Sequence, residues 1–180
     1  AKDRRQRQMC IRDRDKNILK IPQPIIMKNG SKIMSLIDGS KKMSKSDPNE
    51  GSRINLLDTP EIITKKIKRA KSDSYIGIEF NNPERAESKN LLMIYSILSG
   101  KEISQCENEF SETGWGTFKK LITEQLIESL EPIQEKYKVL INDPYQLNKI
   151  LLEGKEKAED LANQTLKRVK SKLGFFEIEK

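Results

Sequence analysis

Residues 114–141 read GWGTFKKLITEQLIESLEPIQEKYKVLI, and this stretch decides the fold class. Its apolar side chains recur at spacings of three, four and five residues, as on the buried face of a long helix. The predicted core residues on this face are Phe118, Leu121, Ile122, Leu126 and Ile127. Pro132 removes one backbone N–H and should kink the helix. The pattern predicts a mainly α-helical protein.

Further helices are predicted on both sides of this stretch. Residues 143–175 begin with Asp143 as a cap and Pro144 in the first turn, which is typical of a helix start. Towards the N-terminus, ISQCENEF at 103–110 predicts one short helix. Pro83 opens another predicted helix, which runs through NLLMIYSIL at 90–98 and stops at Gly100.

Residues 56–71, LLDTPEIITKKIKRAK, predict one more helix with a basic outer side. Asp58 or Thr59 can cap it, and Pro60 suits its first position. Its predicted buried face consists of Ile62, Ile63 and Ile67. The lysines and arginine of the outer side can meet RNA phosphates, and a solvated helix face explains them equally well: Lys65, Lys66, Lys68 and Arg69.

The first part of the chain reads differently. Two prolines two residues apart in ILKIPQPIIM, 18–27, forbid a helix, and the alternation in SKIMSLI, 31–37, predicts a short buried strand that ends at Asp38. The loop DGSKKMSKSDPNEG at 38–51, here called the lysine loop, follows this strand directly. A strand followed by helices predicts the end of one domain joined to an α-helical second one.

The lysine loop has the residues that a polyphosphate site needs. Lys42 and Lys45 lie three residues apart, so both ammonium groups can close on one polyphosphate. The hydroxyls of Ser44 and Ser46 add donors. A solvated turn is the alternative explanation of the loop.

Composition narrows the possible functions. The formal charge is +7, but the basic excess lies in the first 72 residues, and residues 73–180 are net acidic apart from a local patch, KRVKSK, at 167–172. A uniformly cationic binding domain is therefore a poor description of this chain. Cys10 and Cys106, without any histidine, form neither a disulfide framework nor a set of metal ligands. No apolar run approaches the ~20 residues of a membrane span, and we expect a cytoplasmic location.

Residues 1–15, AKDRRQRQMCIRDRD, are rich in arginine and show no helical or strand periodicity. They lack the apolar segment of a secretory signal. We interpret them as a non-native stretch that takes no part in the fold. The alternative is a native, disordered basic arm. The expected organisation is then residues 1–15, a domain end at 16–58 with the lysine loop, and a helical domain at 59–180.

KMSKS at 42–46 resembles the second signature of class I aminoacyl-tRNA synthetases. The likeness continues through SKIMSL, NLLMIYSILSG, GWGTFK, LEPIQEKY and AEDLANQTLKRVKSKLGF, and in order and spacing it is similar to the bacterial tryptophanyl-tRNA synthetase family. The tyrosyl family usually varies the pentapeptide and lacks the Gly-aromatic-Gly-x-Phe-Lys turn. The resemblance implies the end of a Rossmann-like nucleotide-binding α/β domain followed by an α-helical tRNA-binding domain.

The resemblance also implies a role for each residue of the loop. Lys42 and Lys45 would be catalytic, since they would bind the ATP triphosphate and stabilise charge on the departing pyrophosphate. Ser44 and Ser46 would bind phosphate oxygens or fix the loop. Met43 would lie near the adenine, and the backbone of Ile33 would read the adenine edge. Mg²⁺ on the phosphates, tryptophan, tRNA(Trp) and a homodimer of the full-length enzyme are also implied.

Two expectations concern the limits of this resemblance. Class I synthetases carry a first signature with two histidines near the start of the nucleotide-binding domain, and this chain contains no histidine. We therefore expect the chain to resemble the C-terminal half and to be inactive alone. Two alternatives are a tRNA-binding helical module without catalysis and a helical scaffold with an incidental loop.

Trp115 lies between Gly114 and Gly116 at the start of the long helix. An exposed indole is a stacking platform for an unpaired base, which is how RNA sequence is usually read. A packed aromatic side chain at a helix start explains it as well.

Overall fold

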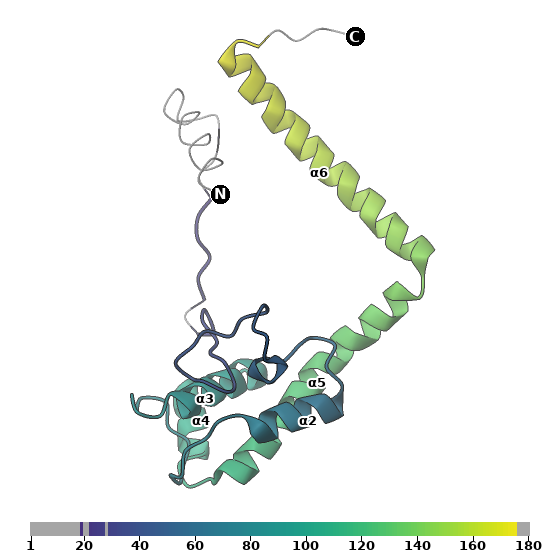
Figure 1. Ribbon diagram of the computed structural model, residues 1–180. Coiled ribbons are helices and arrows are strands. Elements are labelled where there is room, and N and C mark those ends of the chain that lie inside the picture. Colours follow the sequence, from purple (N-terminus) through teal and green to yellow (C-terminus); the bar gives the residue numbers. More distant parts are fainter. Residues whose placement is uncertain (1–18, 20–21, 28, 176–180) are drawn as a thin grey trace. The chain divides into compact units, whose positions relative to one another are not determined.

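The structure is a computed structural model that describes residue 19 and residues 22–27 and 29–175 (Figure 1). A short 3₁₀ turn comes first, followed by five α-helices in the described part of the chain. The elements are η1 (Glu50–Ser52), α2 (Pro60–Arg69), α3 (Ala86–Ser99), α4 (Ile103–Glu109), α5 (Trp115–Ile141) and α6 (Pro144–Leu173). The mainly α-helical fold class is therefore confirmed. The expectation for residues 1–15 falls outside the described residues.

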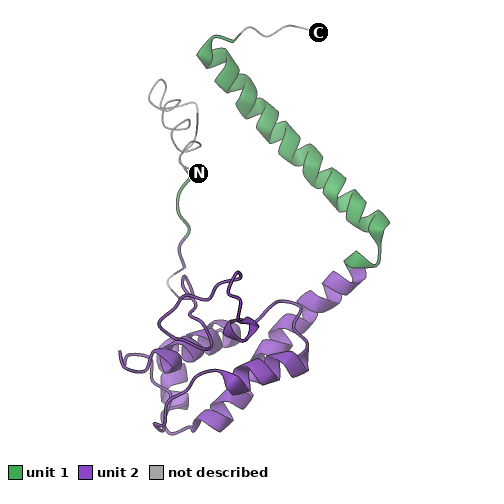
Figure 2. Cartoon of the chain, in the orientation of Figure 1, with its two compact units in different colours: residues 1–25, 140–180 green, residues 26–139 purple. Residues whose placement is uncertain are grey.

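The chain divides into two compact units (Figure 2). One unit comprises residues 26–139 and holds α2, α3, α4, most of α5 and the lysine loop. The other comprises residues 1–25 and 140–180, and α6 is its helix. The lysine loop and the hydrophobic core therefore belong to one unit.

Helix α2 begins as the sequence indicates. Thr59 is its N-cap, and the Thr59 hydroxyl accepts a hydrogen bond from the Ile62 N–H at 3.4 Å. Ile63 and Ile67 are fully buried, but Ile62 is 42% exposed, so its assignment to the core was wrong. The physical reason is the helical rotation of about 100° per residue, which turns Ile62 away from the face that Ile63 and Ile67 share.

Helix α3 begins at Ala86 and not at Pro83, which corrects the predicted start. Asn82 holds the residues before the helix in a turn. Its side chain accepts from the Glu84 N–H at 3.0 Å, and its carbonyl accepts from the Arg85 N–H at 3.1 Å. The predicted end is confirmed, because Gly100 has the left-handed φ of 70° that favours glycine.

The core of residues 26–139 contains an aromatic cluster. Phe110 lies 5.0 Å from Tyr95 and 4.9 Å from Phe118, measured between ring centroids, and both contacts are edge-on. The predicted core face of α5 is confirmed, with three residues buried and two half-buried against the core: Phe118, Ile122, Leu126, Leu121 and Ile127. Pro132 lies inside α5, and the kink remains a prediction.

The strand expected over residues 31–37 is not present, which corrects that prediction. An isolated antiparallel bridge joins Met34 to Lys42 instead, and no strand occurs among residues 22–27 and 29–175. Asn90 on α3 occupies the hydrogen-bonding edge that a second strand would use. Its side chain accepts from the Met34 N–H and donates to the Met34 carbonyl, both at 2.8 Å.

Helix α6 starts and stops at the local signals that the sequence predicts. Asp143 caps it by accepting from the Gln146 N–H at 3.0 Å, Pro144 lies in the first turn, and Gly174 ends it with φ 75°. No residue of α6 is buried.

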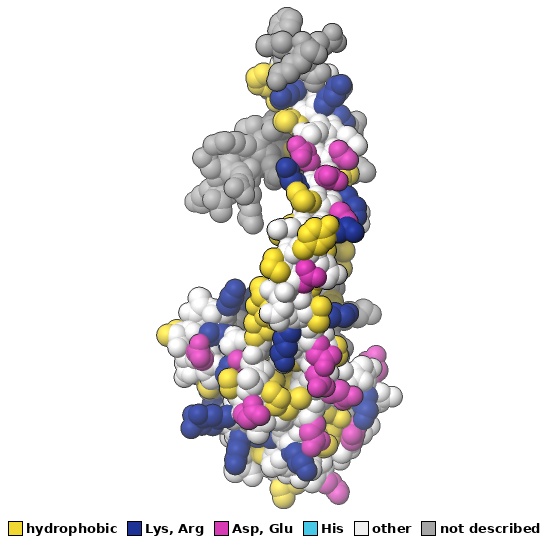
Figure 3. Space-filling view, turned by 90° about the vertical axis from the view of Figure 1, so that its right-hand side faces the viewer, with side chains coloured by type: hydrophobic (Ala, Val, Ile, Leu, Met, Phe, Trp, Pro, Cys, Tyr) yellow, Lys and Arg dark blue, Asp and Glu magenta, His cyan; other side chains and the backbone are white. Residues whose placement is uncertain are grey.

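No helix within the described ranges has the combined length and hydrophobicity that a membrane span needs. Figure 3 shows both basic and acidic side chains on the face in view.

Candidate functional site

The stem of the lysine loop is held by Asp38. Its carboxylate accepts from the Ser40 N–H at 3.1 Å and the Ser40 hydroxyl at 2.5 Å, and it pairs with Lys41 at 3.0 Å. The Ser40 hydroxyl and then Lys41 lower the pKa of Asp38 to about 2. Asp38 is therefore a carboxylate at neutral pH, and it uses Lys41 as its own partner.

The bridge brings together the residues that were expected near a nucleotide base. Met43 donates its N–H to the Ile33 carbonyl at 3.0 Å, and Ser35 donates to the Lys41 carbonyl at 2.8 Å. Ile33 and Met43 are both half-buried. The structure thus places these two residues side by side, although the predicted strand is reduced to one bridge.

The tip of the loop presents its cationic side chains outward. Lys42 and Lys45 are exposed, and neither ammonium has a hydrogen-bond or ion-pair partner among the described residues. The hydroxyls of Ser44 and Ser46 lie 3.1 Å apart and are also exposed. All four predicted phosphate-contacting residues therefore lie on one short segment with their polar groups available to a ligand.

The return of the loop is fixed more firmly than its tip. Arg53 donates to the Asp47 carbonyl at 2.7 Å, and Asp47 accepts from the Asn49 N–H at 2.8 Å. A cavity of about 610 Å³ opens beside this segment. Met43 and Lys45 from the loop and Tyr137 from α5 are among the side chains that line it. The cavity gives the loop an apolar neighbour large enough for part of a nucleotide.

The basic side of α2 differs from the prediction at one position. Lys66 is 9% exposed and donates to Asp58, itself 7% exposed, at 2.5 Å. Burial alone would raise the pKa of Asp58, but hydrogen bonds from Lys66 and Asn55 outweigh it and hold the pKa below its ordinary value. Lys66 therefore serves the interior and does not meet RNA. Its predicted companions on the outer side remain exposed: Lys65, Lys68 and Arg69.

A second site surrounds the indole of Trp115 at the start of α5. A cavity of about 560 Å³ is lined by Trp115, Lys119 and Lys120 together with Thr64 and Lys68 of α2. We call it the indole pocket. The ammonium of Lys119 lies 5.8 Å from the centre of the indole ring. An aromatic face beside three lysines can receive a flat, negatively charged ligand.

Lys119 is anchored as well as charged. Its ammonium donates to the carbonyls of Ala70 at 2.6 Å and Lys68 at 3.3 Å and to the Ser72 hydroxyl at 3.2 Å. It thereby caps the C-terminal end of α2, where backbone carbonyls lack helical partners. Burial lowers the pKa of Lys119. This role was missed because the sequence gives no sign of which helix end Lys119 reaches.

Trp115 has features of both predicted roles, the packed aromatic side chain and the exposed stacking platform. Its ring packs edge-on against Phe118 at 6.2 Å, and its N–H donates to Asp73 at 3.0 Å. It remains half-buried and lines the indole pocket. The indole is therefore packed against Phe118 and is still partly exposed at the pocket.

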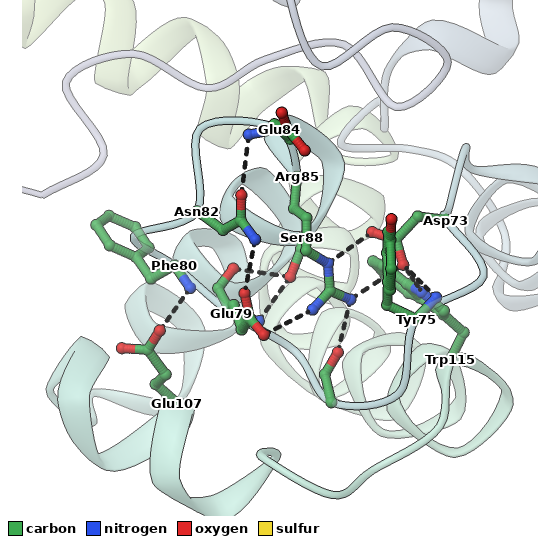
Figure 4. Close-up of polar contacts among 11 residues, drawn as sticks. Asp73, Tyr75, Glu79, Phe80, Asn82, Glu84, Arg85, Ser88, Glu107 and Trp115 are labelled. Atoms are coloured by element: carbon green, nitrogen blue, oxygen red, sulfur yellow. Dashed lines mark hydrogen bonds and ion pairs between the residues drawn. The ribbon is translucent and has the colours of Figure 1, made fainter.

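Asp73 belongs to a buried polar cluster that sequence reasoning also missed (Figure 4). Arg85 is 2% exposed and binds the Asp73 carboxylate with two N–H groups, at 2.8 and 3.0 Å. It donates to the Gly77 carbonyl at 2.7 Å and lies 3.3 Å from a Glu79 oxygen. Burial alone would raise the pKa of Asp73. Hydrogen bonds from Arg85, Trp115 and the Tyr75 N–H outweigh this effect and hold the pKa below its ordinary value.

No group of three or more histidine, cysteine, aspartate or glutamate side chains within the described ranges could hold a metal ion. The lysine loop and the indole pocket each present several lysine side chains. Exposed lysines in and just after an antiparallel bridge, with serine hydroxyl groups beside them, are an arrangement that can bind phosphate groups.

The sequence matches the family model for tRNA synthetases class I (W and Y) over residues 5–131, so the chain belongs to this family. It is 81% identical to a tryptophan–tRNA ligase of Prochlorococcus marinus subsp. pastoris over 167 residues, 93% of this chain and 49% of that protein. A tryptophan–tRNA ligase of Nostoc sp. is 52% identical over 90% of this chain and 48% of its own length. The chain spans about half the length of the curated relatives it matches.

Solved structures agree in fold. A crystal structure of tryptophanyl-tRNA synthetase from Mycoplasma pneumoniae superposes with a TM-score of 0.78 at 29% identity and covers 94% of this chain and 51% of that one. A structure of tryptophanyl-tRNA synthetase from Campylobacter jejuni, complexed with ADP and tryptophan, has a TM-score of 0.62 at 22% identity, over 93% of this chain and 51% of that one. The second likeness shows the fold alone.

Proposed function

We propose that this chain is part of a cytoplasmic tryptophan–tRNA ligase. The enzyme joins the carboxylate of tryptophan to the α-phosphate of ATP with release of pyrophosphate, and it then passes the tryptophanyl group to the 3′ end of tRNA(Trp) with release of AMP. The observation that carries the proposal is the lysine loop, in which the ammonium groups of Lys42 and Lys45 have no partners among the described residues and lie next to the hydrogen bond from Met43 to the Ile33 carbonyl. The names of the curated relatives support the choice of amino acid.

Each residue of the loop has a proposed task. Lys42 and Lys45 bind the triphosphate and stabilise the charge that grows on pyrophosphate as it leaves. Ser44 and Ser46 donate to phosphate oxygens. Met43 lies against the adenine, and the Ile33 backbone reads its edge. Mg²⁺ enters with the substrate, bound to the ATP phosphates, and we assign no residue of this chain to it.

The test uses a chimera, because the chain spans about half the length of its curated relatives. This chain replaces the matching half of the Prochlorococcus ligase, and tryptophan-dependent exchange of pyrophosphate into ATP is measured. We expect exchange by the chimera and none by the 180-residue chain alone. A folded chimera that binds tRNA without exchange would favour the non-catalytic tRNA-binding module.

Single substitutions in the chimera test the loop itself. Lys42→Ala and Lys45→Ala should each reduce kcat/KM at least about tenfold, since losing one charge contact at a transition state costs about 1.4 kcal/mol. Lys41→Ala is the matched control, because Lys41 lies in the same loop but pairs with Asp38. An unchanged rate in both test variants would identify the loop as incidental.

We propose the indole pocket as a contact for tRNA(Trp). Stacking of an unpaired base on an aromatic ring contributes about 1–3 kcal/mol, and lysines nearby attract the phosphates. Trp115 is the sole tryptophan of the chain, so its fluorescence reports on this pocket directly. Binding of tRNA(Trp) should change this emission and weaken with rising salt. Binding without any change in emission would place the contact elsewhere.

A homodimer is proposed for the full-length enzyme on the family resemblance alone. Light scattering of the chimera measures its mass, and a monomeric mass at working concentration would contradict this proposal.

A further inference from the structure

The proposed function gives no task to Arg85, which is more deeply buried than Lys66. Arg85 is 2% exposed, precedes α3 and lies 30 positions before Trp115 in the sequence. Arginine is almost never fully buried unless it is paired, so its partners indicate what it holds in place. Figure 4 shows those partners gathered between the loop at 73–79 and the start of α5.

The link from Arg85 to the indole runs through a single carboxylate oxygen. Asp73 Oδ1 accepts from the Trp115 indole N–H at 3.0 Å, from Arg85 Nη2 at 3.0 Å and from the Tyr75 N–H at 3.0 Å. Asp73 Oδ2 accepts from Arg85 Nε at 2.8 Å. The two parallel bonds from the planar guanidinium fix the orientation of the carboxylate, and the carboxylate in turn fixes the indole.

Arg85 makes further contacts besides those with Asp73. Its Nη2 also donates to the Gly77 carbonyl at 2.7 Å, and the ring of Tyr75 lies 5.5 Å from the centre of the guanidinium. Gly77 is placed by its N–H, which donates to the Thr113 carbonyl at 3.2 Å, two residues before Trp115. The cluster therefore ties the 73–77 segment, α3 and the start of α5 into one arrangement around the indole.

We infer that Arg85 and Asp73 are positioning residues that orient the Trp115 indole, so that its exposed part lines the indole pocket and receives a nucleobase of the RNA. The inference deepens the proposed function and rests on it. An unoriented indole would have to lose rotational freedom on binding, and an indole fixed in advance avoids that entropic cost. A merely structural ion pair would stabilise the fold without changing the state of the indole.

A double-mutant cycle in the complete 180-residue chain separates these roles. Arg85→Met removes the orienting cation, and Trp115→Phe keeps an aromatic ring but removes the N–H that Asp73 holds. Affinity for a tRNA(Trp) transcript is measured by anisotropy of the labelled RNA. We expect each single variant to bind about tenfold more weakly and the double variant to bind within about threefold of the singles, because coupled residues are not additive.

Two further variants test the geometry of the ion pair and control for stability. Arg85→Lys keeps the charge but loses the two-pronged geometry, so we expect it to bind almost as weakly as Arg85→Met. Lys66→Met breaks another buried ion pair of the same unit, that with Asp58, which does not contact Trp115. We expect it to lower the melting temperature while acrylamide quenching of Trp115 and affinity for tRNA stay unchanged.

Quenching of Trp115 by acrylamide reports orientation even without RNA. We expect Arg85→Met to increase quenching at temperatures well below its melting transition. Additive losses in the cycle, unchanged quenching in Arg85→Met, or equal losses of affinity in Lys66→Met would overturn the positioning role. Failure of the wild-type chain to bind the transcript, with increased quenching in Arg85→Met, would instead overturn the RNA pocket and leave the orientation of the indole established.

Discussion

Gly77→Ala should destabilise the chain strongly, and the structure supplies the magnitude. Gly77 has φ 81°, where an L side chain costs about 1–2 kcal/mol, and an added Cβ would lie only 2.1 Å from the Ser111 carbonyl oxygen. Relief of this clash requires a backbone shift that weakens the Gly77–Thr113 and Ile78–Phe110 hydrogen bonds, of 3.2 and 2.9 Å. Each contributes about 1 kcal/mol, so the expected loss is about 3–4 kcal/mol.

Gly100→Ala is a matched control for this substitution. Gly100 has a similar φ of 70°, but nothing lies within 4 Å of its added Cβ, so it should lose only the conformational term of about 1–2 kcal/mol. Urea unfolding followed by circular dichroism measures both free energies. The reasoning would be refuted by equal losses in the two variants. Gly77→Ala should also increase quenching of Trp115, because the Gly77 carbonyl holds Arg85.

Three further predictions concern charges and caps. Lys66→Met should lower the free energy of unfolding in urea by about 3 kcal/mol, because it leaves the buried Asp58 carboxylate without its cation. The double variant Lys66→Met with Asp58→Leu should recover most of this loss. A double variant as unstable as the single one would contradict the prediction. Asp143→Ala should destabilise α6 by about 1 kcal/mol, measured as the loss of helical content on heating. Asp160→Ala changes an exposed residue of the same helix and should have no effect. Equal effects of the two substitutions would argue against the cap. Folding lowers the pKa of Asp73 below its ordinary value of 3.8. The stabilising contribution of Asp73 is therefore present above pH 3.8 and is lost as the pH falls through the pKa of the folded state. Asp73→Asn should reduce the pH dependence of the free energy of unfolding in this range, and an unchanged slope would count against the ion pair.

Local signals in the sequence determined the helices and the lysine loop. The start of α2 follows from Thr59 and Pro60, the start of α6 from Asp143 and Pro144, and the end of α3 from Gly100, because caps and breakers act within one turn of the chain. The lysine loop is likewise a local motif, so its exposed lysines could be selected without knowledge of the fold.

The tertiary structure alone decided how these elements are used. Alternation over 31–37 predicted a strand, but a strand needs a neighbouring backbone edge, and the side chain of Asn90, 56 residues from Met34, takes that edge instead. Lys66 and Arg85 appear in the sequence as two more surface cations. Their burial depends on Asp58 and Asp73, whose positions are set by packing across the chain, and no pattern within a few residues of either cation records that contact.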